Sequence, residues 1–250
     1  MNKINKKILT ILIAAIGSFA GLANGAKKPN ILLILADDLG WSDLACYGNE
    51  YNETMNLDKL AKQGMRFTDA YAACSVCSPT RGSIMTGKSP ARTGLTDWIK
   101  GRTYPDKPLE CPKPLWSLPL EEVTVAEALK AAGYSTYMLG KWHLGGPEYY
   151  PEKQGFDDTF LGTRGGAPRS YFSPYKSKDI KDGPEGEYLT DRITDEAISR
   201  IKNAPADKPW FMYLAYCSVH GPVTSKEETQ QKYKAKNKRG KYKFAAMLEH

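Results

Sequence analysis

The stretch that decides the fold is Pro29-Asn30-Ile31-Leu32-Leu33-Ile34-Leu35-Ala36-Asp37-Asp38. A continuous apolar run of this length, bounded by turn residues, is typical of a strand that is buried on both faces of a parallel sheet. We therefore predict a central parallel strand over residues 31–35. Asp37 and Asp38 follow its carboxyl end, which is the edge where open α/β sheets bind their ligands.

Strand and helix patterns alternate along the rest of the chain. Thr124-Val125-Ala126-Glu127 is a capping box that opens a helix, Gly133 ends this helix, and a strand is expected over 134–140. Apolar residues at helical spacing predict a helix over 189–202, and a further apolar strand follows over 210–216. This alternation predicts an α/β fold with a largely parallel sheet in a single domain.

Two stretches interrupt the alternation. Residues 102–119 are rich in proline, and residues 145–187 are rich in Gly, Pro, Tyr and Lys. We expect irregular loops here, which are either pocket walls or plain surface insertions. If they line a pocket, Arg164, Arg169 and Tyr171 are possible substrate contacts.

The N-terminus has the features of a secretory signal. Three lysines precede an apolar run over 8–20, and small residues over 23–26 offer a cleavage site. We predict a signal peptide over 1–26 and an exported protein that is periplasmic, bound to the cell surface or secreted. The apolar run is short for a membrane span, so no span is expected after cleavage, and a retained signal anchor is the alternative.

The charge of the chain suits anionic substrates. Removing the signal takes away three lysines and no acid, which lowers the formal net charge from +7 to +4. No arginine-rich arm or aromatic-interleaved basic strip is present, so nucleic acid is not an expected partner. We interpret the basic run over 232–243 as a solvated face.

The segment Cys77-Ser78-Pro79-Thr80-Arg81 combines residue types that handle anions. Proline fits the first turn of a helix, and Gly87 is a plausible end for it, so Cys77 would face a helix N-terminus. Free N–H groups there favour an oxyanion, and Arg81 adds a permanently charged planar fork. Taken alone, a cysteine such as Cys77 is more often a small buried apolar residue. The chain has five cysteines, and sequence does not settle whether any of them pair.

Two further motifs follow predicted strands: Gly140-Lys141-Trp142-His143-Leu144-Gly145 and Val219-His220-Gly221-Pro222. Together with residues 28–38 and 77–81, in this order and spacing, they resemble the sulfatase family over nearly the whole mature chain. The resemblance implies an alkaline-phosphatase-like α/β/α sandwich with a largely parallel central sheet. It also implies a sulfuric ester hydrolase that cleaves a sulfated carbohydrate or an aryl sulfate.

The resemblance further implies a role for each motif residue. A formylglycine-generating enzyme would convert Cys77 to Cα-formylglycine, whose hydrate attacks sulfur, and Ca²⁺ would be bound by Asp37, Asp38 and residue 77. Arg81 would hold the formylglycine and Lys141 a sulfate oxygen. His143 would be the base that expels sulfate from the modified residue, and His220 would help to protonate the departing alcohol.

The chain is shorter than the family pattern. The resemblance implies a following strand with an Asp-Asn metal pair, an active-site lysine and a C-terminal domain after the helix at residues 245–250. Calcium usually takes about six to eight oxygen ligands, more than Asp37, Asp38 and residue 77 can supply. We therefore expect residues 27–250 to be the N-terminal, incomplete part of a sulfatase catalytic domain, with weak calcium binding and little turnover.

Two alternative functions stay open. One is a formylglycine-type phosphonate monoester hydrolase or phosphodiesterase, which the cysteine motif does not exclude. The other is a non-catalytic binder of sulfated glycans that keeps the anion pocket. The cysteine in its modification motif argues against the zinc-dependent branch of the superfamily, which uses Ser or Thr as nucleophile.

Overall fold

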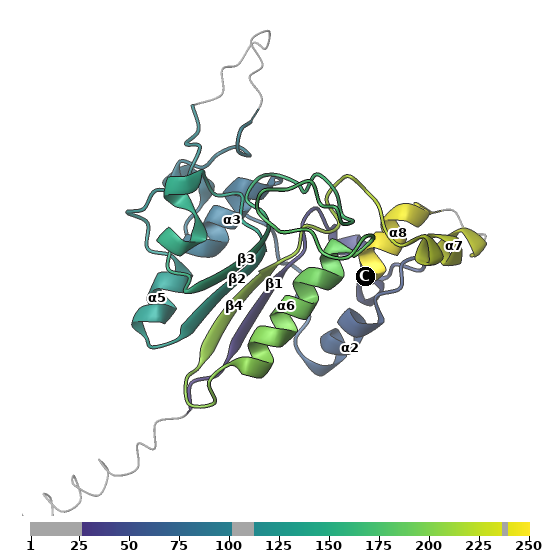
Figure 1. Ribbon diagram of the computed structural model, residues 1–250, viewed down its shortest axis with the longest axis horizontal. Helices are drawn as coiled ribbons and strands as arrows, with labels where there is room; N and C mark the ends of the chain where they lie inside the picture. Colours follow the sequence, from purple (N-terminus) through teal and green to yellow (C-terminus); the bar gives the residue numbers. More distant parts are fainter. Residues whose placement is uncertain (1–26, 102–112, 237–239) are drawn as a thin grey trace, which may run out of the picture. The chain divides into compact units, whose positions relative to one another are not determined.

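The computed structural model of the protein describes residues 27–101, 113–236 and 240–250 (Figure 1). The predicted signal peptide, most of the proline-rich stretch and Cys111 lie outside the described residues. The chain divides into residues 1–30 and a larger unit, Ile31–His250. Residues 27–30 form neither helix nor strand, and the elements below all belong to the larger unit.

One parallel sheet organises the larger unit. Its strands are β1 (Ile31–Leu35), β2 (Ser135–Lys141), β3 (Asp158–Thr163) and β4 (Trp210–Ala215). They are hydrogen-bonded in the order β1-β4-β2-β3, and all three pairings are parallel. The predicted α/β fold with a parallel sheet is therefore confirmed.

The prediction that Ile31–Leu35 forms a central strand is wrong within the described residues. β1 pairs with β4 alone, and its outward-facing Leu32 and Ile34 are 42% and 47% exposed. The strand that is buried at every position is β4. An apolar run indicates that a strand is buried, but it does not give the position of the strand in the sheet. That position depends on pairing with strands that are distant in the sequence.

Helices cover both faces of the sheet. The long helix α6 (Leu189–Asn203) lies across one face in Figure 1, and its Ile193 and Ala197 share a core with Met212 and Leu214 of β4. Helices α3 (Cys77–Thr86) and α5 (Val125–Ala131) cover the other face. The core there contains Met85, Ala126, Met138, Phe211 and Tyr213. This is the α/β/α sandwich that the family resemblance implies.

The remaining elements are short. They are the helices α2 (Met55–Gln63), α4 (Pro90–Thr93), α7 (Glu227–Ala235) and α8 (Tyr242–Glu249), with 3₁₀ turns at Trp41–Asp43, Ala45–Tyr47, Pro147–Tyr149 and Pro151–Lys153. Across the described ranges, no helix combines the length and apolar character needed to cross a membrane.

Two local expectations have different outcomes. The capping box is confirmed, because Thr124 Oγ1 accepts from the Glu127 N–H at 3.1 Å and Glu127 Oε2 accepts from the Thr124 N–H at 2.8 Å. The expectation of an irregular loop over 145–187 is wrong in part, since β3 lies within it. The sequence of β3 contains Gly and Thr and has no clear alternation, so its pairing with β2 decides its conformation.

Gly140 brings the end of β2 close to β4. Its φ is +100°, and a Cβ atom there would lie 1.9 Å from the carbonyl oxygen of Ala215. The register of β2 against β3 shifts between Gly140 and Lys141. Only glycine combines this φ with so close an approach of two backbones. Lys141 and the residues after it therefore depend on Gly140 for their position.

We predict that Gly140→Ala destabilises the protein by about 2–5 kcal/mol, because positive φ disfavours a side chain by about 1–2 kcal/mol and overpacking by about 1–3 kcal/mol. Gly133→Ala is the matched control. Gly133 also has a positive φ, +91°, but nothing lies within 4 Å of an added Cβ. Its expected loss is about 1–2 kcal/mol. Urea unfolding measures both values, and equal losses would contradict the steric argument.

Candidate active site

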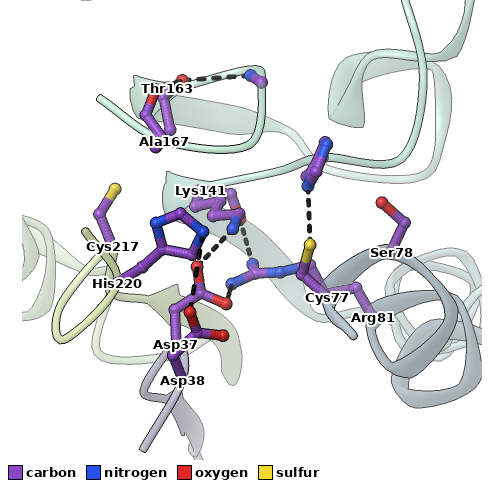
Figure 2. Close-up of polar contacts among 12 residues, drawn as sticks. Asp37, Asp38, Cys77, Ser78, Arg81, Lys141, Thr163, Ala167, Cys217 and His220 are labelled. Atoms are coloured by element: carbon purple, nitrogen blue, oxygen red, sulfur yellow. Dashed lines mark hydrogen bonds and ion pairs between the residues drawn. The ribbon is translucent and has the colours of Figure 1, made fainter. Parts of the chain in front are cut away.

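The carboxyl ends of three strands meet at one edge of the sheet, opposite the N-terminus of α3 (Figure 2). The stretch after β1 brings the two aspartates, the end of β2 brings a lysine and a histidine, and the turn after β4 brings a second histidine. The sequence-predicted residues that gather here are Asp37, Asp38, Cys77, Arg81, Lys141, His143 and His220, linked by contacts in three groups. The structure thus brings together every one of them.

The first group is a buried cluster of two cations on one carboxylate. Asp37 Oδ1 lies 3.3 Å from Arg81 Nη2, and its Oδ2 contacts Lys141 Nζ. The side chains are 5%, 1% and 0% exposed, so solvent screens them little. Arg81 Nη1 also donates to the Lys141 carbonyl oxygen at 2.5 Å. The cluster carries a net positive charge and ties α3 to the ends of β1 and β2.

Arg81 keeps donor capacity for a further partner. Among the described residues, its buried Nε atom has no hydrogen-bond acceptor, and its Nη2 atom has the ion pair with Asp37 at 3.3 Å but no hydrogen bond. Buried N–H groups of this kind are normally satisfied, and the guanidinium fork fits the oxygens of sulfate or phosphate. The charge and donor geometry of the cluster are those that an oxyanion requires.

The second group joins Cys77 to a neutral histidine. Cys77 Sγ lies 3.1 Å from His143 Nδ1, and His143 Nε2 contacts the Ile99 carbonyl oxygen. A carbonyl can only accept, so Nε2 carries the proton and Nδ1 presents its lone pair to residue 77. The pKa of His143 is lowered to about 4, chiefly by burial and also by the nearby cations Lys141 and Arg81, against the opposite effect of the Ile99 carbonyl. At neutral pH the ring is therefore an uncharged base directed at residue 77.

The third group is more open. His220 Nε2 lies 3.7 Å from Asp38 Oδ2, and the two side chains are 29% and 57% exposed. His220 Nδ1 lies 2.8 Å from the Gly221 carbonyl oxygen, which fixes Nδ1 as a donor. Nε2 is therefore the ring atom available to the site, on its solvent-accessible side.

The three possible substrate contacts have different surroundings. Tyr171 is 1% exposed, and its hydroxyl lies 2.8 Å from the carbonyl oxygens of both Cys217 and His220, so it holds the turn that carries His220. The Arg164 guanidinium lies 3.7 Å from the centre of the Tyr150 ring and pairs with Asp179 at 3.3 Å. Arg169, by contrast, is exposed.

Sequence reasoning missed Ile99 as part of the site. Ile99 acts through its backbone, whose carbonyl oxygen meets His143 and whose N–H donates to Ser78 Oγ at 3.1 Å. Its side chain carries no chemical signal, so only the folded chain reveals the contact. Ser78 lies inside the quoted motif, yet sequence gives no partner for its hydroxyl.

The carboxylates match calcium in kind but not in number. Asp37 and Asp38 offer the hard oxygen donors that calcium prefers. Both oxygens of Asp37 contact cationic side chains, however, and the described residues contain no cluster of three or more His, Cys, Asp or Glu side chains that could hold a metal ion. The residues present therefore do not complete a calcium shell.

This fold and site define an α/β protein with a buried cluster of two cations on one carboxylate and a neutral histidine nearby. The Sulfatase family model matches residues 29–245. The chain belongs to the sulfatase family.

Individual relatives agree with this assignment. N-acetylgalactosamine-6-sulfatase of Canis lupus familiaris is 35% identical over 238 residues, which cover 86% of this chain and 44% of that protein. Arylsulfatase A of Homo sapiens is 52% identical over 146 residues, covering 57% of this chain and 26% of that protein. The chain thus spans less than half the length of these relatives.

Solved structures show the same fold. The crystal structure of Ps i-CgsB has a TM-score of 0.73 and 32% identity, and covers 89% of this chain and 52% of that one. The phosphonate monoester hydrolase of Agrobacterium radiobacter has a TM-score of 0.59 at 20% identity over 82% of this chain and 44% of that one, which is a likeness of fold alone.

We predict that Asp37→Asn destabilises the protein by about 3–5 kcal/mol, because it leaves two buried cations without their counter-charge. Asp38→Asn is the matched control, since Asp38 is 57% exposed and its pairing with His220 is long. The control should lose no more than about 1 kcal/mol. Urea unfolding at neutral pH gives both values. A loss of stability in Asp37→Asn as small as that of the control would show that the two cations do not need the Asp37 charge.

A second prediction concerns acid stability. Between the folded pKa of His143, about 4, and its ordinary value of 6.5, the unfolded chain binds more protons than the folded one. Above pH 6.5 neither state binds this proton, and the free energy of unfolding has its full value. As the pH falls from 6.5 towards 4, protonation of His143 in the unfolded chain lowers the free energy of unfolding by about 3 kcal/mol in all. His143→Asn should remove this part of the pH dependence. Unfolding of both proteins from pH 7 to pH 4 tests it, and parallel curves would refute it.

Proposed function

We propose that the protein is a sulfuric ester hydrolase for a carbohydrate or aryl sulfate, with Cys77 as the precursor of a formylglycine nucleophile. The observation that carries this proposal is the contact of Cys77 Sγ with the lone-pair nitrogen of His143 at 3.1 Å. It occurs at the N-terminus of α3, beside the cation cluster, in a member of the sulfatase family. The names of the relatives, which include arylsulfatases and an N-acetylgalactosamine-6-sulfatase, support the substrate class.

Arg81 and Lys141 would bind the sulfate group. Both are buried and positively charged, so they would stabilise charge on the non-bridging oxygens more strongly than exposed cations could. Asp37 holds both cations in place before the substrate arrives. Such preorganisation means that the site needs little rearrangement when charge develops.

The two histidines would move protons on opposite sides of the sulfate. The formylglycine hydrate would supply the nucleophilic oxygen, which a thiol cannot do. His143 Nδ1, already directed at residue 77, would accept a proton there. His220 lies on the more exposed side, where it would bind sulfate and donate a proton to the departing alcohol.

Several further features belong to the proposal. Asp37, Asp38 and residue 77 would contribute to a calcium shell that needs additional oxygen ligands, and calcium would neutralise charge on the sulfate. A sulfatase-maturating enzyme would be the partner that converts Cys77. Residues 1–26 would direct export, and residues 27–250 would belong to the catalytic domain.

We predict that the full-length protein, made in a host with the modifying enzyme, carries an aldehyde at residue 77. Peptide mass spectrometry should then show that residue to be lighter by about 18 Da than cysteine, the difference between the two structures. Cys77→Ala should lower aryl sulfate hydrolysis by about a thousandfold or more, as expected for loss of a nucleophile.

Cys74→Ala is the matched control, because Cys74 is a free thiol in the same segment whose backbone hydrogen-bonds to Thr80, while the sulfur that meets His143 is that of Cys77. It should retain activity. An intact thiol at residue 77 in a fully active protein would overturn the proposal. Hydrolysis rates measured side by side on aryl sulfate and aryl phosphonate distinguish a sulfatase from a phosphonate monoester hydrolase. Binding of sulfated glycans without turnover would indicate a non-catalytic glycan-binding protein.

A further inference from the structure

Ser78 lies at the start of α3, next to the residue that would be modified, and is fully buried. Its hydroxyl oxygen accepts a hydrogen bond from the Ile99 N–H at 3.1 Å. Figure 2 shows the Ser78 side chain turned away from the cation cluster that contains Arg81 and Lys141. Ser78 is therefore placed to act on the backbone at Ile99 and not on a bound anion.

The carbonyl group of Ile99 faces the imidazole ring of His143. The Ile99 carbonyl oxygen contacts His143 Nε2, and the opposite nitrogen of the ring, Nδ1, lies 3.1 Å from Cys77 Sγ. Contacts thus run in one line from the Ser78 hydroxyl through the Ile99 backbone and the imidazole to residue 77. Two neighbours in the sequence, Cys77 and Ser78, are joined by this path across the site.

The path matters because a neutral imidazole has two tautomers. In one, Nδ1 holds a lone pair and can accept a proton from residue 77, whereas in the other Nδ1 carries the proton and cannot. The Ile99 carbonyl favours the first tautomer only while it lies opposite Nε2. In other enzymes, a group that holds a catalytic histidine in its working tautomer has a large effect on rate.

The remaining contacts of His143 fix its backbone and one ring face, not its tautomer. Its N–H donates to the Arg164 carbonyl oxygen at 3.2 Å, and a Cβ on Gly166 would lie 3.2 Å from its Cε1 atom. Neither contact distinguishes Nδ1 from Nε2. Cys77 Sγ can either donate to Nδ1 or accept from it, so it favours neither tautomer by itself. Among the contacts of His143 that the structure describes, the choice of tautomer thus depends on the Ile99 carbonyl, and Ile99 is held through its N–H by the Ser78 hydroxyl.

We propose that Ser78 is a positioning residue that fixes the tautomer of His143 through the backbone of Ile99, so that Nδ1 keeps its lone pair towards residue 77. This inference rests on the proposed function for its catalytic consequence but not for its structural one. The tautomer can be measured in the protein with an unmodified Cys77, where no turnover is needed.

The first experiment is ¹⁵N NMR of the histidine rings in the full-length protein, made in a host without the modifying enzyme. The His143 signals are assigned by their loss in His143→Asn. The wild type should show the tautomer protonated at Nε2 alone, and Ser78→Ala should show a mixture of both. A single Nε2 tautomer in Ser78→Ala would overturn the inference.

Matched variants separate the hydroxyl from general damage to the helix. Ser83 lies in the same helix, and its buried hydroxyl has no partner among the described residues. Ser83→Ala should therefore match the wild type, and Ser78→Thr, which keeps a hydroxyl, should restore the single tautomer. If Ser78→Ala does not fold, Ser78→Cys replaces it, because a thiol is a weak acceptor of similar size. A mixture in Ser83→Ala, or none in Ser78→Cys, contradicts the proposal.

The second experiment measures hydrolysis of an aryl sulfate by the modified full-length protein. Ser78→Ala should lower kcat by about tenfold, as typical for loss of an orienting partner, and leave KM unchanged, because Ser78 does not touch the cations that would bind sulfate. A rise in KM at constant kcat would refute the positioning role. An inactive wild type would instead count against the proposed function, and the NMR result would stand on its own.

Discussion

The interaction on which the site depends is the ion-pair cluster of Asp37 with Arg81 and Lys141. One buried carboxylate holds two buried cations that come from a helix and from the end of a neighbouring strand. Two cations at this depth would repel each other strongly without it. The cluster therefore fixes the spacing between α3 and the sheet edge, and it keeps a net positive charge ready for an anion.

The two histidines of the site differ because their surroundings differ. His143 is 2% exposed and is held between a thiol and a backbone carbonyl, so burial lowers its pKa to about 4 and keeps it neutral. His220 is 29% exposed and faces the Asp38 carboxylate. One residue type thus provides an uncharged base on the closed side and an exposed imidazole beside a carboxylate on the open side.

Much of the architecture could be predicted from local patterns. The capping box at Thr124, the helix over 189–203 and the apolar strand over 210–215 all form where their periodicity indicates. The edge position of β1 and the presence of β3 could not be predicted, because strand order and pairing depend on partners far away in the sequence. Tyr171 shows the same limit, since an aromatic residue in a loop can equally contact a ligand or support a turn.

The sequence by itself determined the residue types of the site, their order along the chain and their places at the ends of strands and at the start of a helix. Parallel strands then bring those ends to one edge, so the gathering of the side chains follows from the pattern. Only the tertiary structure decided that Asp37 is shared by two cations, that Ile99 selects the tautomer of His143 and that Ser78 holds Ile99. These are contacts of backbone atoms and buried charges between distant segments, and their directions exist only after the chain has folded.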